Sequence, residues 1–294
     1  MSRLVHAALT ARMTNSTRPT LVLGATGTTG RRVADRLTAR GVPVRRGSRS
    51  GRPPFDWTDE STWGPVLEGV AAAYLVYSPD LVAPGAVDVV RRFGAAALSS
   101  GVRRLVLLSG RGEPAAEAAE RAVQDVAPES TIVRCAFFMQ NFSEKGFGDF
   151  VRSGTVALPA PPVGEPFVDA DDIADVAVAA LTGDGHAGQL YELTGPRLLT
   201  FAEAVGEIAT ATGRHVRYLE VSAAEFVAGL VAQGVSEDDA AVFAEIFGTV
   251  LDGRNAHLAD GVRRALGREP HDFGDFARSA AAAGVWDVPA RTGA

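Results

Sequence analysis

The sequence predicts an α/β fold, a doubly wound parallel sheet followed by a smaller, mostly helical lobe. Short apolar runs alternate with helical segments from Thr20 to Arg134, as is typical of parallel strands that helices cover on both faces. A glycine-rich turn joins the first run to the first helix, and after about Asn141 longer loops and successive helices take over. We therefore expect a core domain at residues 19–150 and a lobe mainly at 151–294, with some segments of the lobe returning to the core.

The core is defined by its strands and by the helices between them. Apolar runs predict strands at 20–23, 42–45, 71–77, 104–109 and 130–134, and a further short strand that ends near Phe55-Asp56-Trp57. Helical periodicity predicts helices at 31–40, 85–100 and 115–126. This alternation is typical of consecutive strand–helix–strand units.

The second half of the chain is organised differently. Pro159-Ala160-Pro161-Pro162 breaks the pattern, and the segment from Phe167 to Asp172 leads into a helix predicted at 173–181. Further helices are predicted at 201–212, 223–233, 238–251 and 273–283. Doubly wound proteins bind ligands beyond the carboxyl ends of their strands, so we expect the lobe to cover that edge of the sheet.

Composition and charge exclude several classes of protein. The 294 residues carry a formal net charge of −6, and their basic residues are scattered, so we expect no nucleic-acid partner. No run reaches the roughly 18 apolar residues of a membrane span, and we expect no membrane partner. Residues 1–18 are interpreted as a flexible extension. The single cysteine, Cys135, fits a cytoplasmic location, while the oligomeric state stays open.

No metal site is predicted. The five histidines show no spacing that is typical of metal ligands. Asp169, Asp171 and Asp172 stand immediately before an apolar helix, where carboxylates serve as N-terminal caps.

The strongest chemical signal is the turn Gly24-Ala25-Thr26-Gly27-Thr28-Thr29-Gly30, which follows the first strand and opens the first helix. Gly24 permits a tight turn, Gly27 lets a pyrophosphate approach the backbone, and Gly30 lets helix and strand pack closely. Free N–H groups and the positive helix end attract phosphates. The candidate cofactor ligands here are Gly24, Thr26, Gly27, Thr28, Thr29 and Gly30. The turn predicts a Rossmann-type dinucleotide-binding core; an ordinary strand-to-helix turn is the alternative.

The end of the second strand indicates which dinucleotide binds. An acidic residue there would hold the ribose hydroxyls of NAD, but the sequence reads Arg45-Arg46-Gly47-Ser48-Arg49-Ser50. An arginine with adjacent hydroxyls suits a 2′-phosphate, so NADP(H) is favoured over NAD(H), with Arg49 and Ser50 as ligands. The alternative is a solvated basic loop. Asp56 is a candidate acceptor for the adenine amino group, unless it caps the next turn.

Further blocks of sequence narrow the family. They are Ser48-Arg49-Ser50, Phe55-Asp56-Trp57, the segments 101–109, 138–144 and 167–174, and Leu193-Thr194-Gly195-Pro196. Together they resemble the NmrA-like branch of the atypical short-chain dehydrogenases, over nearly the whole chain from Thr20 to Trp286. Within that branch they are most similar to the festuclavine and agroclavine dehydrogenases of ergot alkaloid assembly. The resemblance implies an NAD(P)H-dependent reductase, in a branch that also includes NADPH sensors without turnover.

The residues limit the chemistry further. Classical members of the superfamily reduce ketones with a Tyr-x-x-x-Lys pair, whose tyrosine donates the proton; the corresponding segment, Gly112 to Arg121, contains neither residue. Hydride addition to a carbonyl needs a donor, whereas addition to an iminium carbon discharges a cation. We therefore expect an oxidoreductase that transfers hydride to an activated acceptor in a small metabolite: an imine or iminium, a quinone or a conjugated enone. The alternative is a catalytically silent NADPH-sensing regulatory protein.

The pocket is expected where the strand ends meet the second lobe. Candidates for a catalytic role are Tyr77, whose loop the resemblance places beside the nicotinamide ribose, Ser109 and Asn141. Tyr77, Ser109 and Phe138 are also candidate cofactor ligands. The substrate-binding candidates lie after the sixth strand or in a helical lid, and are Phe137, Phe138, Asn141, Phe226, Phe243 and Phe247. Each aromatic ring has an alternative role in a plain hydrophobic core.

Overall fold

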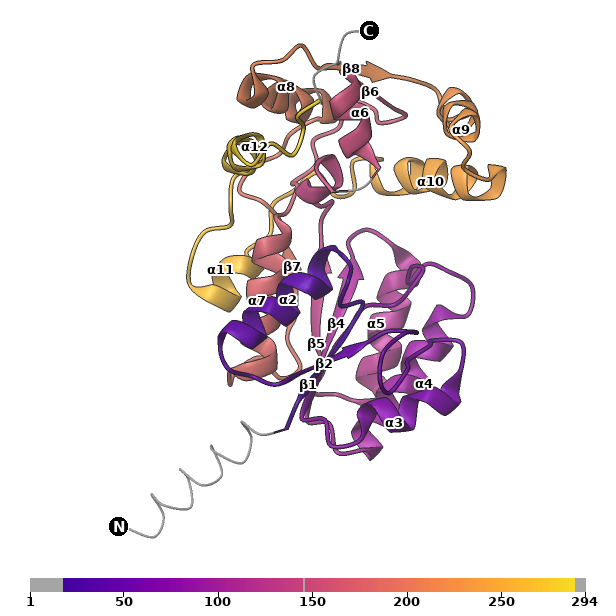
Figure 1. The fold of residues 1–294 in the computed structure, drawn as a ribbon, viewed down its shortest axis with the longest axis vertical. Helices are drawn as coiled ribbons and strands as arrows, with labels where there is room; N and C mark the ends of the chain where they lie inside the picture. Colours follow the sequence, from indigo (N-terminus) through magenta and orange to yellow (C-terminus); the bar gives the residue numbers. More distant parts are fainter. Residues whose placement is uncertain (1–17, 145, 289–294) are drawn as a thin grey trace, which may run out of the picture.

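The computed structural model describes residues 18–144 and 146–288. Figure 1 shows a sheet flanked by helices in the lower half and a smaller, mainly helical lobe above it. Of the predicted flexible extension, residues 1–17 lie outside the described residues, while Arg18 donates hydrogen bonds to the carbonyl oxygens of Gly69 and Val70. No described helix is both long and apolar enough to cross a membrane.

The main sheet has six strands in the order β2-β1-β3-β4-β5-β7, and every neighbouring pair is parallel. They are β1 (Thr20–Leu23), β2 (Val44–Gly47), β3 (Ala72–Leu75), β4 (Arg104–Gly110), β5 (Thr131–Cys135) and β7 (Leu190–Leu193). The chain runs outward from β1 to β2 and then continues on the other side of β1. The predicted doubly wound sheet is thus confirmed, with its switch point between β1 and β3.

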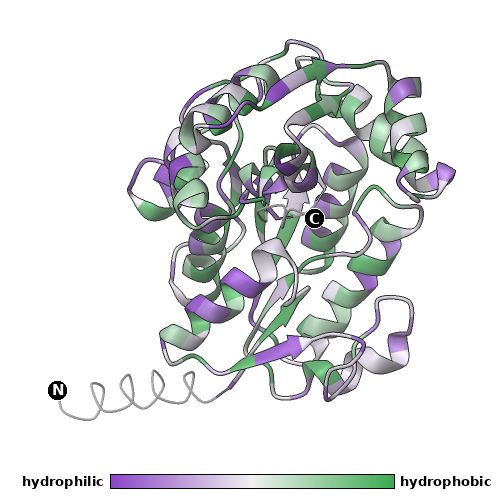
Figure 2. Cartoon of the chain, turned by 45° about the horizontal axis from the view of Figure 1, so that its top comes forward, coloured by the Kyte–Doolittle hydropathy of each residue, from purple (hydrophilic) through white to green (hydrophobic). Residues whose placement is uncertain are grey.

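Helices cover both faces of this sheet. One face carries α2 (Thr28–Ala39), α7 (Ala170–Thr182) and α11 (Gly261–Leu266), and the other carries α3 (Trp63–Leu67), α4 (Ala86–Ser99) and α5 (Pro114–Val126). Alternate residues of a strand face opposite sides, so Val22 packs toward α2 and α7 while Leu21 and Leu23 pack toward α4. Figure 2 shows hydrophobic residues concentrated on the central strands. Burial on both faces explains why the strands read as continuous apolar runs.

The helices α7 and α11 and the strand β7 are segments of the second half that return to the core. Arg36 of α2 pairs with Asp171 at 2.6 Å and with Asp175 at 2.8 Å, which joins α7 to α2. β7 then pairs with β5 at the edge of the sheet. Its Leu-Tyr-Glu-Leu sequence alternates between half-buried and buried positions, so it lacks the continuous apolar signal and was not among the predicted strands.

The smaller lobe surrounds a cluster of aromatic rings. It contains α6 (Phe147–Ser153), α8 (Phe201–Thr212), α9 (Ala223–Ala232), α10 (Glu237–Val250), α12 (Phe273–Ala282) and a parallel pair of strands, β6 (Thr155–Leu158) and β8 (Arg217–Glu220). The turn η2 (Met139–Phe142) leads from β5 into this lobe. Phe142 lies at the centre of the cluster, and its carbonyl accepts the indole N–H of Trp286 at 2.7 Å. The four predicted helices of the lobe are confirmed to within one residue at each end.

One predicted strand is wrong. Around Phe55-Asp56-Trp57 the described structure has only an isolated bridge between Asp56 and Asp59, followed by the turn η1 (Glu60–Thr62). Asp56 accepts hydrogen bonds from the backbone and hydroxyl of Thr58, so local turn chemistry replaces strand pairing here. The second strand also begins two residues later than predicted, because Val44 is the residue that pairs with Thr20.

Candidate active site

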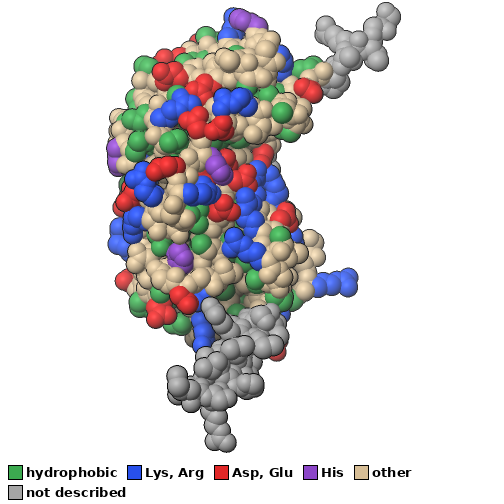
Figure 3. Space-filling view, turned by 90° about the vertical axis from the view of Figure 1, so that its left-hand side faces the viewer, with side chains coloured by type: hydrophobic (Ala, Val, Ile, Leu, Met, Phe, Trp, Pro, Cys, Tyr) green, Lys and Arg blue, Asp and Glu red, His purple; other side chains and the backbone are tan. Residues whose placement is uncertain are grey.

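The switch point of the sheet lies below the junction of the two lobes. Gly24 follows β1 and Val76 follows β3; a Cβ placed on Gly24 would lie 3.1 Å from the Cβ of Val76, so the two loops are in close contact. Figure 3 shows the outline of the molecule hollowed between the lobes on its right-hand side. Ligands of doubly wound proteins bind at this point, and the loops after β1 to β5 therefore form the candidate site.

The glycine-rich turn has a geometry that fits a pyrophosphate. Gly24 has φ +63°, and the N–H of Gly27 donates to its carbonyl at 2.8 Å. A Cβ on Gly30 would lie 2.2 Å from the same carbonyl oxygen, so the helix approaches the strand too closely for any side chain. Gly27 is the N-cap of α2, provides no side-chain cap, and the described first turn holds no acidic residue. No side chain of α2 caps its own N-terminus, so its backbone N–H groups can bind an anion. The Glu144 carboxylate lies close to this end of the helix and interacts with the Thr28 side chain.

The predicted ligands of the 2′-phosphate and of adenine lie together after β2. Arg49 and Ser50 are exposed, and Arg49 is near enough to Asp56 for its charge to act on that carboxyl. The pKa of Asp56 lies below its usual value, chiefly because the backbone and side chain of Thr58 donate to it and secondarily because of Arg49. Asp56 thus caps its own turn, and the adenine contact remains a prediction.

A further arginine lies beside the turn and was not among the predicted ligands. Arg46 donates to the carbonyl of Ala25 at 3.3 Å and pairs with Asp35 at 3.0 Å. Arg45, the preceding residue, points the other way and bonds the carbonyls of Val66 and Glu68. The alternation of side chains along a strand separates the two arginines. Both arginines lie inside β2 (Val44–Gly47), whereas the predicted strand ended at Arg45. A sequence prediction with the observed bounds would have indicated that Arg45 and Arg46 point to opposite faces.

Of the two candidate residues at the ends of β3 and β4, Tyr77 is half-buried and Ser109 is buried. Tyr77 is half-buried after β3, with its ring centroid 5.0 Å from that of Trp57. Ser109, near the end of β4, is buried and donates its hydroxyl to Glu120 of α5 at 2.6 Å. Glu120 is 2% exposed and also accepts both from Nε of Arg134 at 2.9 Å and from its Nη2. The hydroxyl of Ser109 therefore belongs to a buried polar network beside α5.

The loop after β5 is held in a defined position. Gln140 is buried, donates to Asp169 at 2.8 Å and accepts from the backbone N–H of Ala170 at 2.7 Å. Phe138 forms a parallel bridge with Val168. Asn141 is half-buried in η2, and no hydrogen bond engages its side-chain amide within the described residues. This amide is thus a free polar group beside a fixed loop.

The predicted substrate-binding aromatics fall into two groups. Phe137 packs its ring against Phe201 at 5.3 Å and Phe247 at 6.1 Å between centroids, and Phe226 lies 5.6 Å from Phe247. These four rings belong to the core cluster of the lobe. Phe243 on α10 is instead 51% exposed. The alternative role in a hydrophobic core is therefore observed for Phe226 and Phe247, and their contact with a substrate remains a prediction.

Two acidic residues near these loops were missed by the sequence reasoning. Glu165 is 1% exposed and accepts the N–H of Phe137 at 3.0 Å; burial raises its pKa to about 7, against the opposing effects of this hydrogen bond and of Arg111. Burial, together with the charge of Asp80, also raises the pKa of Glu113 to about 7. Neither residue lies in a recognisable motif. Glu165 is buried and Glu113 is half-buried, and the residues that act on their pKa values lie far from them in the sequence or on other loops.

Arg111, whose charge acts on Glu165, is buried and held by contacts of its own. It is 3% exposed, donates from Nη1 to the carbonyl of Asn255 at 2.9 Å and has Nε 3.2 Å from Glu192. The amide of Asn255 returns a hydrogen bond to the carbonyl of Arg111 at 3.2 Å. The loop after β4 is therefore fastened to the segment that follows α10.

The buried carboxyl of Glu165 predicts a pH-dependent stability. The pKa of Glu165 is higher in the folded state than in the unfolded state, so its protonated side chain favours the folded state. This contribution to stability is complete below the unfolded pKa near 4.5 and is lost as pH rises through about 7. We expect the free energy of unfolding of Glu165→Gln, relative to that of wild type, to be roughly 3 kcal/mol higher at pH 8 than at pH 5. Urea unfolding at both pH values measures this, with the exposed Glu68→Gln as control. Equal pH dependence of wild type and Glu165→Gln would contradict the prediction.

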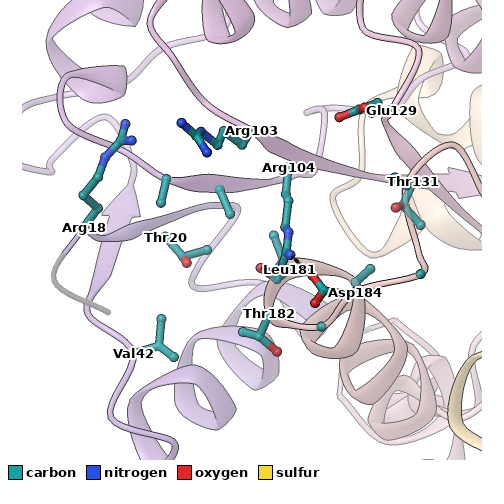
Figure 4. Close-up of a pocket in the computed structure, with 16 residues that line it drawn as sticks. Arg18, Thr20, Val42, Arg103, Arg104, Glu129, Thr131, Leu181, Thr182 and Asp184 are labelled. Carbon is teal, nitrogen blue, oxygen red and sulfur yellow. Dashed lines mark hydrogen bonds and ion pairs between the residues drawn. The ribbon is translucent and has the colours of Figure 1, made fainter. Parts of the chain in front are cut away.

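Two cavities lie outside this site. Figure 4 shows one of about 480 Å³ lined by Thr20, Arg104 and Thr131, which stand at the starts of their strands, so it faces the opposite edge of the sheet. A second, of about 540 Å³, lies between α2 and α12. Its two arginines, Arg31 and Arg32, both pair with Glu144. Neither cavity is part of the predicted dinucleotide site.

The aspartates before α7 have structural partners. Asp169 caps α7 by accepting the N–H of Asp171 at 2.8 Å, as predicted. Asp172 is fully buried and pairs with Arg268 at 2.6 Å. Over residues 18–144 and 146–288, no group of three or more His, Cys, Asp or Glu side chains is placed to hold a metal ion.

Comparison with known proteins gives full-length relatives. No family model matches the sequence. The chain is 34% identical over 276 residues to the uncharacterized oxidoreductase YesF of Bacillus subtilis, covering 90% of this chain and 96% of that protein. It is 33% identical over 277 residues to agroclavine dehydrogenase of Claviceps fusiformis, covering 87% and 95%.

Solved structures share the fold at lower identity. Triphenylmethane reductase of Citrobacter, complexed with NADP(H), has a TM-score of 0.71 and 20% identity over 89% of this chain and 99% of that one. The NADPH-dependent quinone oxidoreductase of Escherichia coli, complexed with NADPH, has a TM-score of 0.70 and 19% identity over 88% and 99%. Nmra, a negative transcriptional regulator in complex with NAD, has a TM-score of 0.68 and 16% identity over 92% and 99%.

Proposed function

Because the chain belongs to the NmrA-like family of atypical short-chain dehydrogenases, with agroclavine dehydrogenase among its relatives, we propose that it is an NADP(H)-dependent reductase. The reaction passes hydride to an activated acceptor in a small metabolite, in the cytoplasm and without a nucleic-acid or membrane partner. The observation that carries the proposal is the uncapped N-terminus of α2 beside the glycine-rich turn, at the switch point of the sheet.

The cofactor is held by residues along the carboxyl edge of the sheet. The turn from Gly24 to Gly30 cradles the pyrophosphate, and Arg49 with Ser50 binds the 2′-phosphate, supported by their exposure after β2. Tyr77 and Phe138, from the loops after β3 and β5, flank the nicotinamide. The bound cofactor supplies the hydride, while the protein orients the acceptor and excludes water.

The acceptor class follows from the residues that are missing. The segment from Gly112 to Arg121 has no Tyr-x-x-x-Lys pair, and the hydroxyl of Ser109 is engaged by Glu120. Such a site suits an acceptor that is already activated, because its reduction depends least on a proton donor from the protein. Acceptors of this kind are an imine or iminium, a quinone or a conjugated enone. In this proposal Phe137 walls the pocket and Asn141 donates a hydrogen bond to the acceptor, which is supported by the lack of a partner for its amide among the described residues.

A paired titration tests the proposal. Purified protein is titrated with NADPH and NADH while the fluorescence of the reduced nicotinamide is recorded, and a panel of iminium ions, quinones and enones is then added. The proposal expects tight NADPH binding and consumption of NADPH with at least one acceptor. Absence of NADPH binding would overturn the proposed cofactor, and binding without turnover on the whole panel would overturn the proposed reaction.

The preference for NADP(H) is tested at Arg49. Loss of a bidentate, charge-assisted contact and repulsion by the new carboxylate should weaken NADPH binding by Arg49→Glu roughly 100-fold, while NADH binding changes less than about threefold. Arg52→Glu in the same exposed loop is the matched control for charge. Equal losses for the two cofactors would remove Arg49 from the 2′-phosphate site.

A sensor function is the second candidate. It is favoured by the engagement of Ser109 with Glu120 inside the core, which leaves the loop after β4 without the usual serine and tyrosine. A sensor would bind the dinucleotide and consume none with any acceptor. The acceptor panel therefore separates it from the reductase.

A further inference from the structure

The carboxyl group of Glu113 lies over the carboxyl end of β4. Glu113 is the N-cap of α5 but makes no side-chain cap bond. A Cβ placed on Gly110 would lie 2.5 Å from one carboxyl oxygen of Glu113 and 2.7 Å from the other. The side chain therefore folds back onto the strand end, into the space that the missing side chain of Gly110 leaves.

This carboxyl group has no structural partner in the described chain. Across residues 18–144 and 146–288, no hydrogen bond or ion pair engages its oxygens. Glu120, two turns further along α5, differs in this respect, because its carboxyl group accepts hydrogen bonds from Ser109 and Arg134. Glu113 is half-buried, and partial burial of an acidic group without a protein partner costs stability; such a cost is retained most often at functional sites.

The charged group that acts on Glu113 is another carboxylate, that of Asp80. Asp80, in the loop after β3, acts on it through space, and this charge adds to burial in raising the pKa of Glu113 to about 7. The charged groups of the other neighbouring elements have partners of their own. These pairs are Arg111 with Glu192, Arg254 with Asp252, and Glu117 with Arg121 and Arg134.

The position of Glu113 matches the acceptor end of the site. β4 lies between β3 and β5, and parallel strands end at one edge. The loop of Glu113 therefore stands between the loop of Tyr77 and the loop of Phe137. The adenine end lies on the other side of β1, beyond β2, where Arg49 is found. Glu113 is thus on the half of the crevice where the nicotinamide and the acceptor meet.

We propose that Glu113 is the proton donor of this enzyme, in place of the missing tyrosine. The inference rests on the proposed reductase function. For a quinone, the acceptor gains a hydride from NADPH and a proton from the carboxylic acid of Glu113; the products are the hydroquinone, NADP⁺ and the Glu113 carboxylate. Water then reprotonates the carboxylate from the side of exposed Asp80. An iminium acceptor needs no such proton.

The proposal predicts which acceptors depend on Glu113. In Glu113→Gln we expect kcat for a quinone to fall 10²- to 10⁴-fold, with KM and the NADPH dissociation constant changed less than about threefold. The loss for a permanently charged iminium ion should be at least tenfold smaller, because its reduction requires no proton. The matched control is Glu117→Gln, one turn along the same helix and already paired, which should retain the quinone rate.

The pH profile tests the same assignment through Asp80. The acid form of Glu113 is active, so kcat for the quinone should fall as pH rises through about 7. Asp80→Asn removes the negative charge that raises this pKa, and the descending limb should then shift to lower pH. A structural role for Glu113 would not move this limb.

A spectroscopic titration of the protein without cofactor gives an independent result. The infrared carbonyl band of protonated carboxylic acids should contain two groups that titrate near pH 7, and each of Glu113→Gln and Glu165→Gln should remove one of them. Full quinone turnover by Glu113→Gln, or an unchanged band, would overturn the proton donor. Absence of turnover by wild type with every acceptor would instead overturn the reductase function itself, and the proton donor with it.

Discussion

Replacing Gly27 by valine is expected to abolish the binding of both NADPH and NADH while leaving the fold intact. A Cβ at this position would meet only the carbonyl oxygen of Gly24, at 3.3 Å, so the protein itself accommodates a side chain with a small adjustment. The isopropyl group would occupy the space where the pyrophosphate approaches the N-terminus of α2. We expect at least a 100-fold loss of affinity by fluorescence titration, with a melting temperature within a few degrees of wild type.

Gly30→Val is the matched comparison, because it fails for a different reason. Its Cβ would lie 2.2 Å from the carbonyl oxygen and 2.6 Å from the carbonyl carbon of Gly24, which are backbone atoms that cannot turn away. We therefore expect it to lower the melting temperature strongly as well as to abolish binding. Retained NADPH binding by Gly27→Val would refute the assignment of this turn to the dinucleotide, whatever the behaviour of Gly30→Val.

Replacing Glu120 by alanine is expected to cost about 3–5 kcal/mol of stability, the usual range for breaking a buried ion pair by removing one partner. Glu120 accepts from Ser109 and from two nitrogens of Arg134, and Arg134 is itself mostly buried. In the variant the Arg134 guanidinium loses its two hydrogen bonds to Glu120 while it stays mostly buried. Urea unfolding measures the loss, and Glu117→Ala, with weaker and more exposed contacts to the same arginine, should lose less than about 1 kcal/mol.

Ser109→Ala distinguishes a structural serine from one that orients the substrate. If the hydroxyl serves only the network, the variant loses about 1 kcal/mol of stability and keeps its turnover. If it orients the acceptor or the nicotinamide, kcat falls while the stability changes by the same small amount. The bond to Glu120 favours the first outcome, and a loss of turnover in Ser109→Ala would contradict it.

The two lobes meet through a small number of anchored loops, which gives the site its shape. Gln140 fixes η2 to the start of α7 through Asp169, and Arg32 links Glu144, beyond η2, with Asp171 of α7. The loop after β4 is fastened through Arg111 to Asn255, beyond α10. The candidate residues Phe138, Asn141 and Glu113 therefore stand on loops that both lobes hold.

The geometry of the glycine-rich turn was predictable from the sequence because its signals are local. A glycine-rich turn between a strand and a helix specifies backbone geometry within seven residues, and Gly24 to Gly30 adopt it. Short apolar runs likewise predicted five of the six parallel strands, and for β1, β3, β4 and β5 the signal comes from burial on both faces of the sheet. Only β7, half-exposed at the edge, escaped this signal.

The acceptor end was decided by tertiary structure, because burial and charge there come from segments far apart in the chain. Nothing in the sequence around Glu113 or Glu165 indicates a carboxyl group with a raised pKa; Asp80, Gly110 and Phe137 come close to these side chains only when the strand ends converge. The same holds for Ser109, whose partner Glu120 comes from the next helix, and for the separate directions of Arg45 and Arg46. Local sequence patterns were thus enough to predict the fold and to propose where a dinucleotide binds, whereas long-range packing decides which side chains near the strand ends have no partner in the protein.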